Sequence, residues 1–463
     1  MASSALWDPE SVRLPHFTPG LEKIAEPSRQ QLPLQGNIKD SVILVIWRST
    51  DHYFPICKHI RAFGIPTMWL VLTTTCCLIC GTLNADRFFN LENEANPEVW
   101  MNISEIITYN GYPSEEYDVT TQDGYILSVN RIPHGRRGAR SPGPRPVVYL
   151  QHALFADNAS WLENYANGSL GFLLADAGYD VWMGNSRGNT WSRRHRTLSV
   201  TEEKFWAFSF DEMAKYDLPA IVDLIVNKTG QEKMYFIGHS LGTTIGFVAF
   251  STMPELAQRI KMNFALGPVV SFKYPTGIFT SFFLLPNSII KGIFGTKGVF
   301  LKTGKEPALK ICNNKILWVI CSEFLSLWAG YDKKNMNMSR MDVYMSHAPT
   351  GSSMQNILHI KQLYRSDEFR AYDWGSEAEN MHHYNQSRPP LYDLTAMKVP
   401  TAMWAGGHDV LVTFRDVARV IPQIRNLQYF HLLPDWNHFD FIWGLDAPQK
   451  VYSKIIALMK SYS

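Results

Sequence analysis

A serine set between two glycines is the residue of this sequence with the clearest chemical signature. The segment Gly238-His-Ser-Leu-Gly242 follows directly on the apolar run Met234–Ile237, and small residues continue after it. A strand that turns sharply into a helix at a Gly-x-Ser-x-Gly segment lifts the serine hydroxyl clear of the backbone, and the glycines let strand and helix approach closely. This context favours a nucleophile elbow with Ser240 as the nucleophile over a serine in an ordinary tight turn.

A serine nucleophile requires a histidine base, because an unaided hydroxyl reacts poorly. In nucleophile-elbow enzymes the acid and then the base follow the serine along the chain. His438 lies in the loop after the last predicted strand, which is the expected place for the base. His431 falls within that strand and His408 directly precedes the favoured acid, so we regard both as weaker candidates.

The acid that orients this histidine is expected at the end of a late strand. Asp409 ends the segment Gly406-Gly-His-Asp409, directly after a predicted strand, from which its carboxylate would reach the histidine. Asp435 and Asp440 flank His438 and are the alternatives. The sequence therefore predicts a triad of Ser240, His438 and Asp409.

The tetrahedral intermediate of ester hydrolysis needs hydrogen-bond donors for its oxyanion. One donor is expected from the backbone N–H of the residue after the nucleophile, Leu241, and the other from the loop after an early strand. That loop reads Gln151-His-Ala-Leu-Phe155, so we expect Leu154 N–H as the second donor. His152 in the same loop is interpreted as a residue that supports the loop by hydrogen bonds and not as a base.

The overall composition argues for a large folded enzyme and against several other classes. The 463 residues are 46% hydrophobic and 19% charged, enough apolar surface for a sizeable core. The 44 basic and 42 acidic residues leave a formal net charge of +2, which argues against a nucleic-acid partner. There is no His-Glu-x-x-His segment and no glycine-rich phosphate loop, so we expect neither a metal nor another cofactor.

The elements that must position the triad alternate between strands and helices. Asp123-Gly124 between two alternating segments predicts a hairpin, and the later apolar runs predict buried parallel strands. Right-handed crossovers then give an α/β-hydrolase fold, with a mostly parallel sheet covered by helices on both faces. We expect strands at 116–121, 125–132, 147–150, 179–183, 234–237, 261–266, 399–405 and 427–433, and helices at 96–109, 168–178, 210–227 and 242–253.

The alternation of strands and helices stops within a long central segment. Residues 271–393 are rich in Phe, Leu, Trp and Met and read as irregular and helical. We interpret this segment as an inserted, mainly helical cap and lid over one end of the sheet. The hydrolase core is then expected in two parts, residues 86–270 and residues 394–463.

The N-terminal region carries a signal for export. An apolar run, Met68–Cys80, is followed by the small-residue segment Leu83-Asn-Ala85. We therefore expect residues 68–85 to be a cleaved signal peptide of a secreted or, alternatively, a lysosomal protein. Residues 1–67 would then be a translation artefact or an alternative form, whereas a signal anchor over Gly64 to Leu83 is the competing interpretation.

Two further features are typical of a protein that passes through the secretory lumen. Cys312 and Cys321 are the cysteines left after removal of the signal peptide, and they are either free thiols or a local disulfide. Several Asn-x-Ser/Thr sequons offer acceptors for glycans. These sequons begin at Asn102, Asn158, Asn167, Asn227, Asn337 and Asn385.

Several longer segments together resemble one enzyme family. The resemblance runs from about Asn96 to the C-terminus. It is carried by the segments 96–105, 112–117, 123–127, 184–192 and 211–219. The family is that of the acid lipases, which includes gastric lipase and lysosomal acid lipase.

This resemblance implies hydrolysis of acylglycerols or cholesteryl esters, often at acidic pH. The substrate would be met at a lipid–water interface, in transient contact with a membrane or lipid droplet, without colipase and without a metal. The resemblance carries the triad onto Ser240, Asp409 and His438, and the oxyanion donors onto Leu154 and Leu241. The apolar character of the cap favours long acyl chains.

The resemblance also implies a disulfide between Cys312 and Cys321, within a cap whose lid moves at a lipid surface. The lid would extend from roughly Phe300 to Gly330. Two positions depart from the usual family pattern, since relatives usually have Gln in place of Leu241 and Gly in place of Ala153. Because oxyanion donation uses backbone N–H groups, these changes alter the polarity of the pocket and the freedom of the loop rather than remove the donors.

Two other functional classes remain open. The same fold could carry a catalytically silent lipid-binding glycoprotein, although such proteins usually lack a triad member, and all three are present here. It could also carry a thioesterase or a peptidase, because one fold hosts many chemistries.

Overall fold

The computed structural model describes most of the chain from residue 96 onward, with a few gaps. The upstream extension, the signal peptide, both Cys312 and Cys321 and most of the predicted lid lie outside the described residues, so these interpretations stay predictions. Among the helices that are described, none combines the length and the apolar character that crossing a bilayer requires. The described residues are 96–138, 143–276, 278–300, 323, 330, 334–366 and 368–462.

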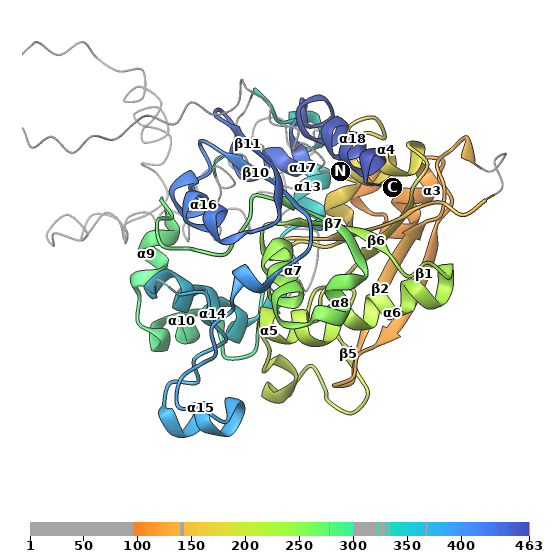
Figure 1. The fold of residues 1–463 in the computed structure, drawn as a ribbon. Helices are drawn as coiled ribbons and strands as arrows, with labels where there is room; N and C mark the ends of the chain where they lie inside the picture. The colour runs from red at the N-terminus through yellow and green to blue at the C-terminus, as the bar shows by residue number, and fades with distance from the viewer. Residues whose placement is uncertain are drawn as a thin grey trace, which may run out of the picture. The chain divides into compact units, whose positions relative to one another are not determined.

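A mostly parallel sheet forms the centre of the fold (Figure 1), which confirms the predicted fold class. Its strands run in the order β1-β2-β4-β3-β6-β7-β10-β11. The first pairs, β1 with β2 and β2 with β4, are antiparallel, and the remaining neighbours are parallel. The bounds are β1 Glu115–Thr120, β2 Tyr125–Ile132, β3 Val147–Gln151, β4 Asp180–Gly184, β6 Met234–His239, β7 Ile260–Leu266, β10 Thr401–Gly406 and β11 Leu427–Leu433, with a short β5, Arg194–His195, paired to β2.

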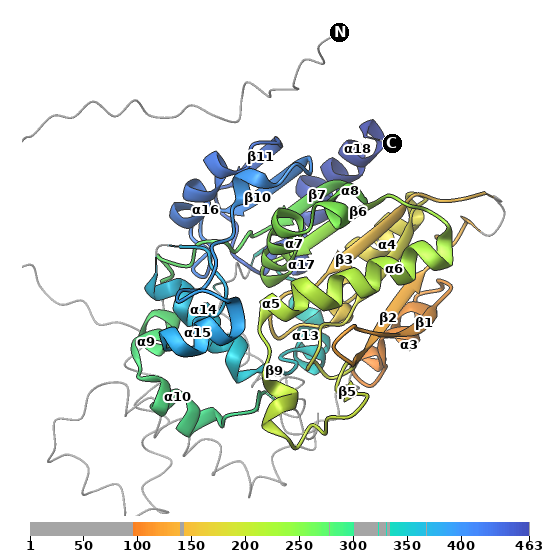
Figure 2. The same ribbon diagram turned by 60° about the horizontal axis from the view of Figure 1, so that its bottom comes forward.

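Side chains alternate between two apolar layers along each buried strand, as strand geometry requires. In β6, Met234 and Phe236 pack into one layer, whereas Tyr235 and Ile237 pack into the other. Figures 1 and 2 show α6 and α7 together on one side of the sheet and α4 and α18 on the other. The helices are α3 Ile103–Tyr109, α4 Leu170–Asp176, α5 Phe210–Glu212, α6 Leu218–Thr229, α7 Leu241–Thr252, α8 Pro254–Gln258, α16 Phe414–Val420, α17 Asp440–Trp443 and α18 Ser453–Ser461.

Two predicted helices differ from the structure in ways that local chemistry explains. The helix expected over 96–109 is a short 3₁₀ turn, Pro97–Val99, followed by α3. The break occurs because Asn102 caps α3: its side chain accepts from Glu105 N–H, and Glu105 accepts in turn from Asn102 N–H. The helix expected over 210–227 contains a π-helical turn, Met213–Asp217, between α5 and α6.

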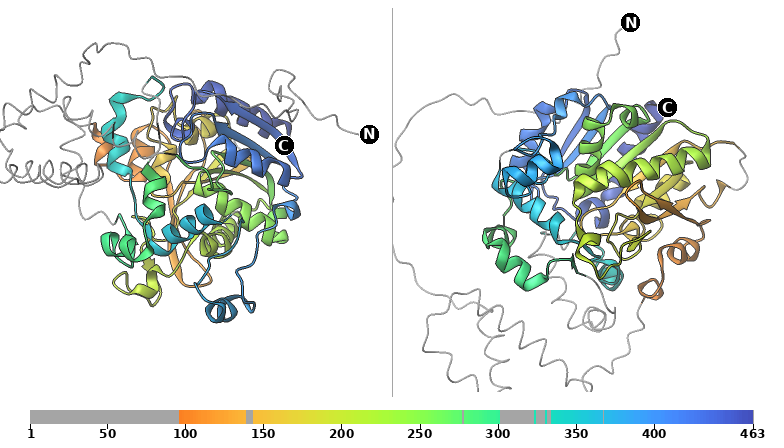
Figure 3. Two further views of the ribbon diagram at one scale, coloured as in Figure 1. Left: turned by 90° about the vertical axis from the view of Figure 1, so that its left-hand side faces the viewer. Right: turned by 90° about the horizontal axis from the view of Figure 1, so that it is seen from below.

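The segment between β7 and β10 contains most of the predicted cap. Figures 1 and 3 show α9, α10, α14 and α15 gathered to one side of the sheet. In contrast, α13 packs into the hydrolase core, where the ring of Tyr344 stacks on Trp443 at 4.6 Å between centroids. The elements of this insertion are α9 Ile278–Leu284, α10 Asn287–Phe294, β8 Gly298–Val299, α13 Met341–His347, β9 Ser352–Ser353, α14 Met354–Arg365 and α15 Glu377–Tyr384.

Candidate active site

Ser240 lies at the sharp turn between β6 and α7. Its backbone adopts φ 53° and ψ −119°, a conformation that is strained for a residue with a side chain. A Cβ at Gly242 would lie 2.2 Å from the carbonyl oxygen of Gln151, and one at Gly238 would lie 2.8 Å from the backbone of Gly242. The two glycines are therefore required by close backbone approach, and the turn presents Ser240 at the carboxyl end of the sheet.

His438 and Asp409 come together from two loops at the same end of the sheet. His438 Nδ1 donates to Asp409 Oδ2 at 2.7 Å, and both side chains are buried. Asp409 Oδ1 accepts from the backbone N–H groups of Leu411 and Val412 at 2.9 and 2.8 Å, which sets the direction of the carboxylate. With Nδ1 protonated toward a carboxylate, the imidazole presents the lone pair of Nε2 as a base.

The alternative bases and acids occupy other environments. His408 and Asp435 are exposed, and His431 lies within β11. Asp440 is buried, but its Oδ2 accepts from Asn437 N–H at 2.6 Å and so braces the loop. Across the described part of the chain, no three histidine, cysteine, aspartate or glutamate side chains come together as a possible metal site.

Ser240 and His438 line one large cavity. About 1560 Å³ of empty space, which includes open solvent, lies between its mostly apolar walls. Loops of the hydrolase core form one side, and α9, α10 and α14 of the insertion form the other. The apolar lining includes Leu154, Leu241, Phe272, Phe282, Phe283, Phe294, Met354, Ile357, Ile360 and Leu411.

The two expected oxyanion donors lie beside the same cavity. Leu241 is the first residue of α7, where the N–H groups have no acceptor within the helix and the helix dipole is positive. Leu154 lies in a turn closed by Ala156 N–H and Ala153 C=O at 3.2 Å. Among the described residues, neither the Leu154 nor the Leu241 N–H donates to a protein acceptor, so both can donate to a substrate oxygen.

His152 ties the loop that contains Leu154 to the segment after β4. Its Nε2 accepts from Ser186 N–H at 3.0 Å, and its Nδ1 donates to the carbonyl of Ala153 at 2.8 Å. Burial lowers the pKa of His152 to about 4, so the ring is neutral at physiological pH and can accept at Nε2. These contacts match the supporting role expected from the sequence.

His239 is a site residue that the sequence analysis missed. Its Nε2 lies 3.1 Å from the carbonyl oxygen of His438, and the two rings lie 5.0 Å apart between centroids. Burial, together with the charge that His438 can carry, holds the pKa of His239 well below its usual value. The neutral ring therefore donates to the backbone of His438. Its position directly before Ser240 was the only signal in the sequence.

The sequons have very different environments. Asn158 is fully buried, and its Nδ2 donates to Asn130 Oδ1 at 2.9 Å and to the carbonyl of Met183 at 2.8 Å. The prediction of a glycan at Asn158 is therefore wrong, because a glycan must extend into solvent. The other sequon asparagines are exposed or partly exposed and stay predictions: Asn102, Asn167, Asn227, Asn337 and Asn385.

Comparison with family models agrees with this architecture. Residues 146–445 match the model described as alpha/beta hydrolase fold, and residues 103–165 match one described as a partial alpha/beta-hydrolase lipase region. A solved structure from Sulfolobus solfataricus has a TM-score of 0.52 at 12% identity, covering 76% of this chain and 94% of that chain. At this identity the likeness concerns the fold alone.

Curated relatives cover most of the chain at much higher identity. Human lipase member N is 83% identical over 86% of this chain and 100% of its own length. Human lysosomal acid lipase/cholesteryl ester hydrolase is 54% identical over 83% of this chain and 97% of its own length. Human gastric triacylglycerol lipase is 51% identical over 85% of this chain and 99% of its own length.

Proposed function

Because this chain belongs to the acid lipase family of α/β hydrolases, and is therefore a lipid ester hydrolase, we propose that Ser240, His438 and Asp409 are its catalytic triad and that its substrates are acylglycerols or cholesteryl esters. One observation carries the proposal: Ser240 and a histidine bonded to a buried aspartate line the same large apolar cavity.

The first half of the reaction forms an acyl-enzyme. Ser240 Oγ attacks the ester carbonyl carbon while His438 Nε2 takes the hydroxyl proton, and Asp409 stabilises the resulting imidazolium. The carbonyl oxygen becomes an oxyanion, which accepts hydrogen bonds from the N–H groups of Leu154 and Leu241. The tetrahedral intermediate then collapses, His438 gives its proton to the alkoxide, and the alcohol leaves.

The second half releases the fatty acid. His438 takes a proton from a water molecule, whose oxygen attacks the acyl carbonyl carbon and re-forms an oxyanion in the same position. Collapse of this intermediate breaks the bond to Ser240 Oγ, which recovers its proton from His438. The residues that act in these steps all come from the hydrolase core. The insertion contributes one side of the cavity wall.

The cavity and the relatives both support the proposed substrate class. An apolar cavity favours a long acyl chain, because every buried methylene group adds about 0.8 kcal/mol to binding. The names of two relatives contain cholesteryl ester hydrolase and triacylglycerol lipase, and both ester classes are candidates here.

The setting in which the enzyme works is part of the same proposal. It meets its substrate at a lipid–water interface, through transient contact with a membrane or lipid droplet, and needs no colipase. The enzyme reaches this interface as a secreted or lysosomal protein, after cleavage of the signal peptide at residues 68–85. The relatives that share its family include a lysosomal and a gastric lipase, which supports this location.

The test is release of fatty acid from emulsified trioleoylglycerol and from cholesteryl oleate, near pH 5 and near pH 7. Wild-type protein is compared with Ser240→Ala and with Ser251→Ala, a matched control further along α7. We expect release by the wild type and by the control, and none by Ser240→Ala at an unchanged melting temperature. Release that persists in Ser240→Ala would refute the assigned nucleophile. A folded wild type that releases no fatty acid from either lipid and does not hydrolyse short esters would favour the lipid-binding alternative.

A further inference from the structure

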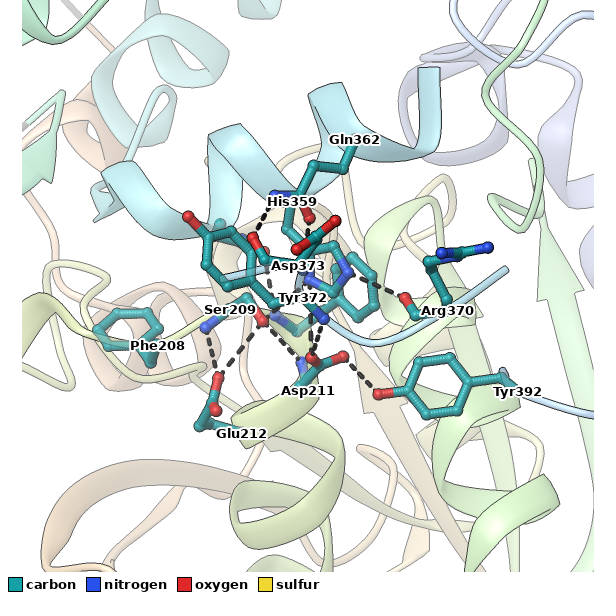
Figure 4. A network of polar contacts seen from close by, with 12 residues as sticks. Phe208, Ser209, Asp211, Glu212, His359, Gln362, Arg370, Tyr372, Asp373 and Tyr392 are labelled. Carbon is teal, nitrogen blue, oxygen red and sulfur yellow. Dashed lines mark hydrogen bonds and ion pairs between the residues drawn. The ribbon is translucent and has the colours of Figure 1, made fainter. Parts of the chain in front are cut away.

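A largely buried polar cluster joins the insertion to the hydrolase core (Figure 4). It consists of Ser209, Asp211 and Glu212 at the start of α5 and His359 on α14. The side chains of Ser209 and His359 are fully buried. None of these residues takes part in the hydrolysis described above, so the cluster requires its own explanation.

The hydrogen bonds of His359 determine where its proton lies. Its Nε2 lies 3.0 Å from the carbonyl oxygen of Arg370, which can only accept, so Nε2 carries a hydrogen. In the neutral ring Nδ1 is then an acceptor. The nearest donor to Nδ1 is the hydroxyl of Ser209, at 3.0 Å.

The Ser209 hydroxyl faces two acceptors with a single hydrogen. Its Oγ lies 3.0 Å from His359 Nδ1 and 3.3 Å from Glu212 Oε2. When the imidazole is neutral and the carboxylate is ionised, the hydroxyl can donate to only one of them. Glu212 Oε2 also accepts from Ser209 N–H at 2.7 Å, so it is the contact between the side chains that lacks a hydrogen. One added proton, on His359 Nδ1 or on Glu212, supplies the second hydrogen and completes the row of hydrogen bonds.

The charges in the cluster favour uptake of that proton. Asp211 and Glu212 are adjacent carboxylates, and Asp211 Oδ2 lies 3.8 Å from His359 Nδ1. Burial raises the pKa of Asp211 to about 6 and also raises the pKa of Glu212, whereas burial lowers the pKa of His359 to about 4. These directions place the added proton on the carboxylate side of the cluster.

Groups from each neighbouring element face the cluster. Asp211 also accepts from Tyr392 OH at 2.6 Å and from Tyr372 N–H at 2.8 Å, both within the insertion. Arg187, from the segment after β4, lowers the pKa of Glu212 but is bound to carboxylates of its own, Asp123 and Asp217. The other titratable groups that act on the cluster or lie beside it are Lys215, Asp373 and Tyr384.

The cluster holds a helix that forms a wall of the catalytic cavity. From α14, Met354, Ile357 and Ile360 line the cavity, while His359 and Asn356 contact α5. Phe210 of α5 stacks on His359 at 3.9 Å between centroids, and its N–H donates to Asn356 at 3.0 Å. A change in the hydrogen bonds of His359 therefore acts directly on the attachment of this wall.

We propose that Ser209, Asp211, Glu212 and His359 form a proton-binding site that takes up a proton between neutral and mildly acidic pH and thereby fastens α14 to the hydrolase core. Because the folded protein binds this proton more tightly than the unfolded chain, the stabilisation is complete below the pKa of the unfolded carboxyl. It is lost as pH rises through the higher folded pKa. The proposal concerns the stability of the cavity wall and does not depend on which ester is hydrolysed.

The test is the melting temperature of the full secreted chain measured from about pH 7.5 to about pH 5. The buried neutral rings of His152 and His239 lower the melting temperature of wild type and variants alike on acidification. The site is therefore measured by the difference in melting temperature between the wild type and Glu212→Gln or Ser209→Ala, which we expect to grow by roughly 2–4 °C in favour of the wild type on acidification. Asn356→Ala removes a neutral contact from the same junction, so its difference from the wild type should be the same at each pH.

Protection of α14 from hydrogen exchange provides a second measurement. After correction for intrinsic exchange, the peptide covering 354–365 should be better protected at the lower pH in the wild type and not in Ser209→Ala. The proposal is overturned if acidification changes the melting temperatures of the wild type, Glu212→Gln and Ser209→Ala by the same amount. It is also overturned if the gain in protection persists in Ser209→Ala.

Discussion

Replacement of Asp409 by asparagine gives a sharp test of the proposed triad. The backbone N–H groups of Leu411 and Val412 both donate to Asp409 Oδ1, so an asparagine must keep its oxygen at that position. Its amide nitrogen then faces His438 Nδ1, which now donates to Asp409 Oδ2 at 2.7 Å. Two donors cannot share a hydrogen bond, so the imidazole must change tautomer, and Nε2 becomes protonated and loses its function as a base.

The expected loss of kcat is large because His438 stays in place but can no longer accept a proton at Nε2. The same replacement in a serine protease triad lowers kcat by about 10⁴-fold, and we expect a loss of that order here. This corresponds to about 5.4 kcal/mol in the activation free energy. Substrate binding should change little, because the apolar cavity walls are untouched.

The assay is kcat and KM on a soluble short-chain ester, which avoids effects of the lipid surface. Asp435→Asn is the matched control, since this exposed aspartate lies in the same loop as His438. The control should retain wild-type kcat and both variants should keep the wild-type melting temperature. If Asp409→Asn retained more than about a tenth of wild-type kcat, another acid would orient the histidine and the triad assignment would be incorrect.

Three further results are expected. Gly242→Ala should cost about 3 kcal/mol or more of the free energy of unfolding, visible as lost secretion or a lower melting temperature, because its Cβ would lie 2.2 Å from a carbonyl oxygen. His239→Phe should lower kcat about 10-fold at similar KM, since it removes the donor to the backbone of His438, and His239→Gln should recover part of the loss. Equal kcat in the wild type and both variants would contradict this role. Asn158→Gln should leave the electrophoretic mobility of the secreted protein unchanged, whereas loss of the exposed sequon in Asn167→Gln should increase it if that site carries a glycan.

Local patterns in the sequence were sufficient for the sheet and for the turn that carries Ser240. The last strand was predicted at 427–433 and β11 has the same bounds, because a short segment of Leu and aromatic residues between turn residues has the length and composition of a strand. The position of Ser240 between β6 and α7 followed from the two glycines, whose lack of a side chain allows that turn. The break before α3 was also local, since Asn102 and Glu105 form a capping box, but helical spacing on both sides concealed it.

Only the tertiary structure distinguished between residues with equivalent local signals. Asp409, Asp435 and Asp440 all lie near His438 or on a suitable loop, and the choice among them depends on which carboxylate the folded loops bring to the imidazole. Asn158 carries the same sequon as the exposed asparagines, yet packing of the loop after β3 buries it.

The proton-binding cluster could not be predicted at all. Ser209 and His359 are 150 residues apart in the sequence and meet only because α14 of the insertion packs against α5 of the core. Hydrophobic period and turn chemistry act over a few residues, so they determine strands, helices and tight turns. Burial, charge and hydrogen-bond partners depend on which faces of distant elements pack together, and therefore only the folded chain decides them.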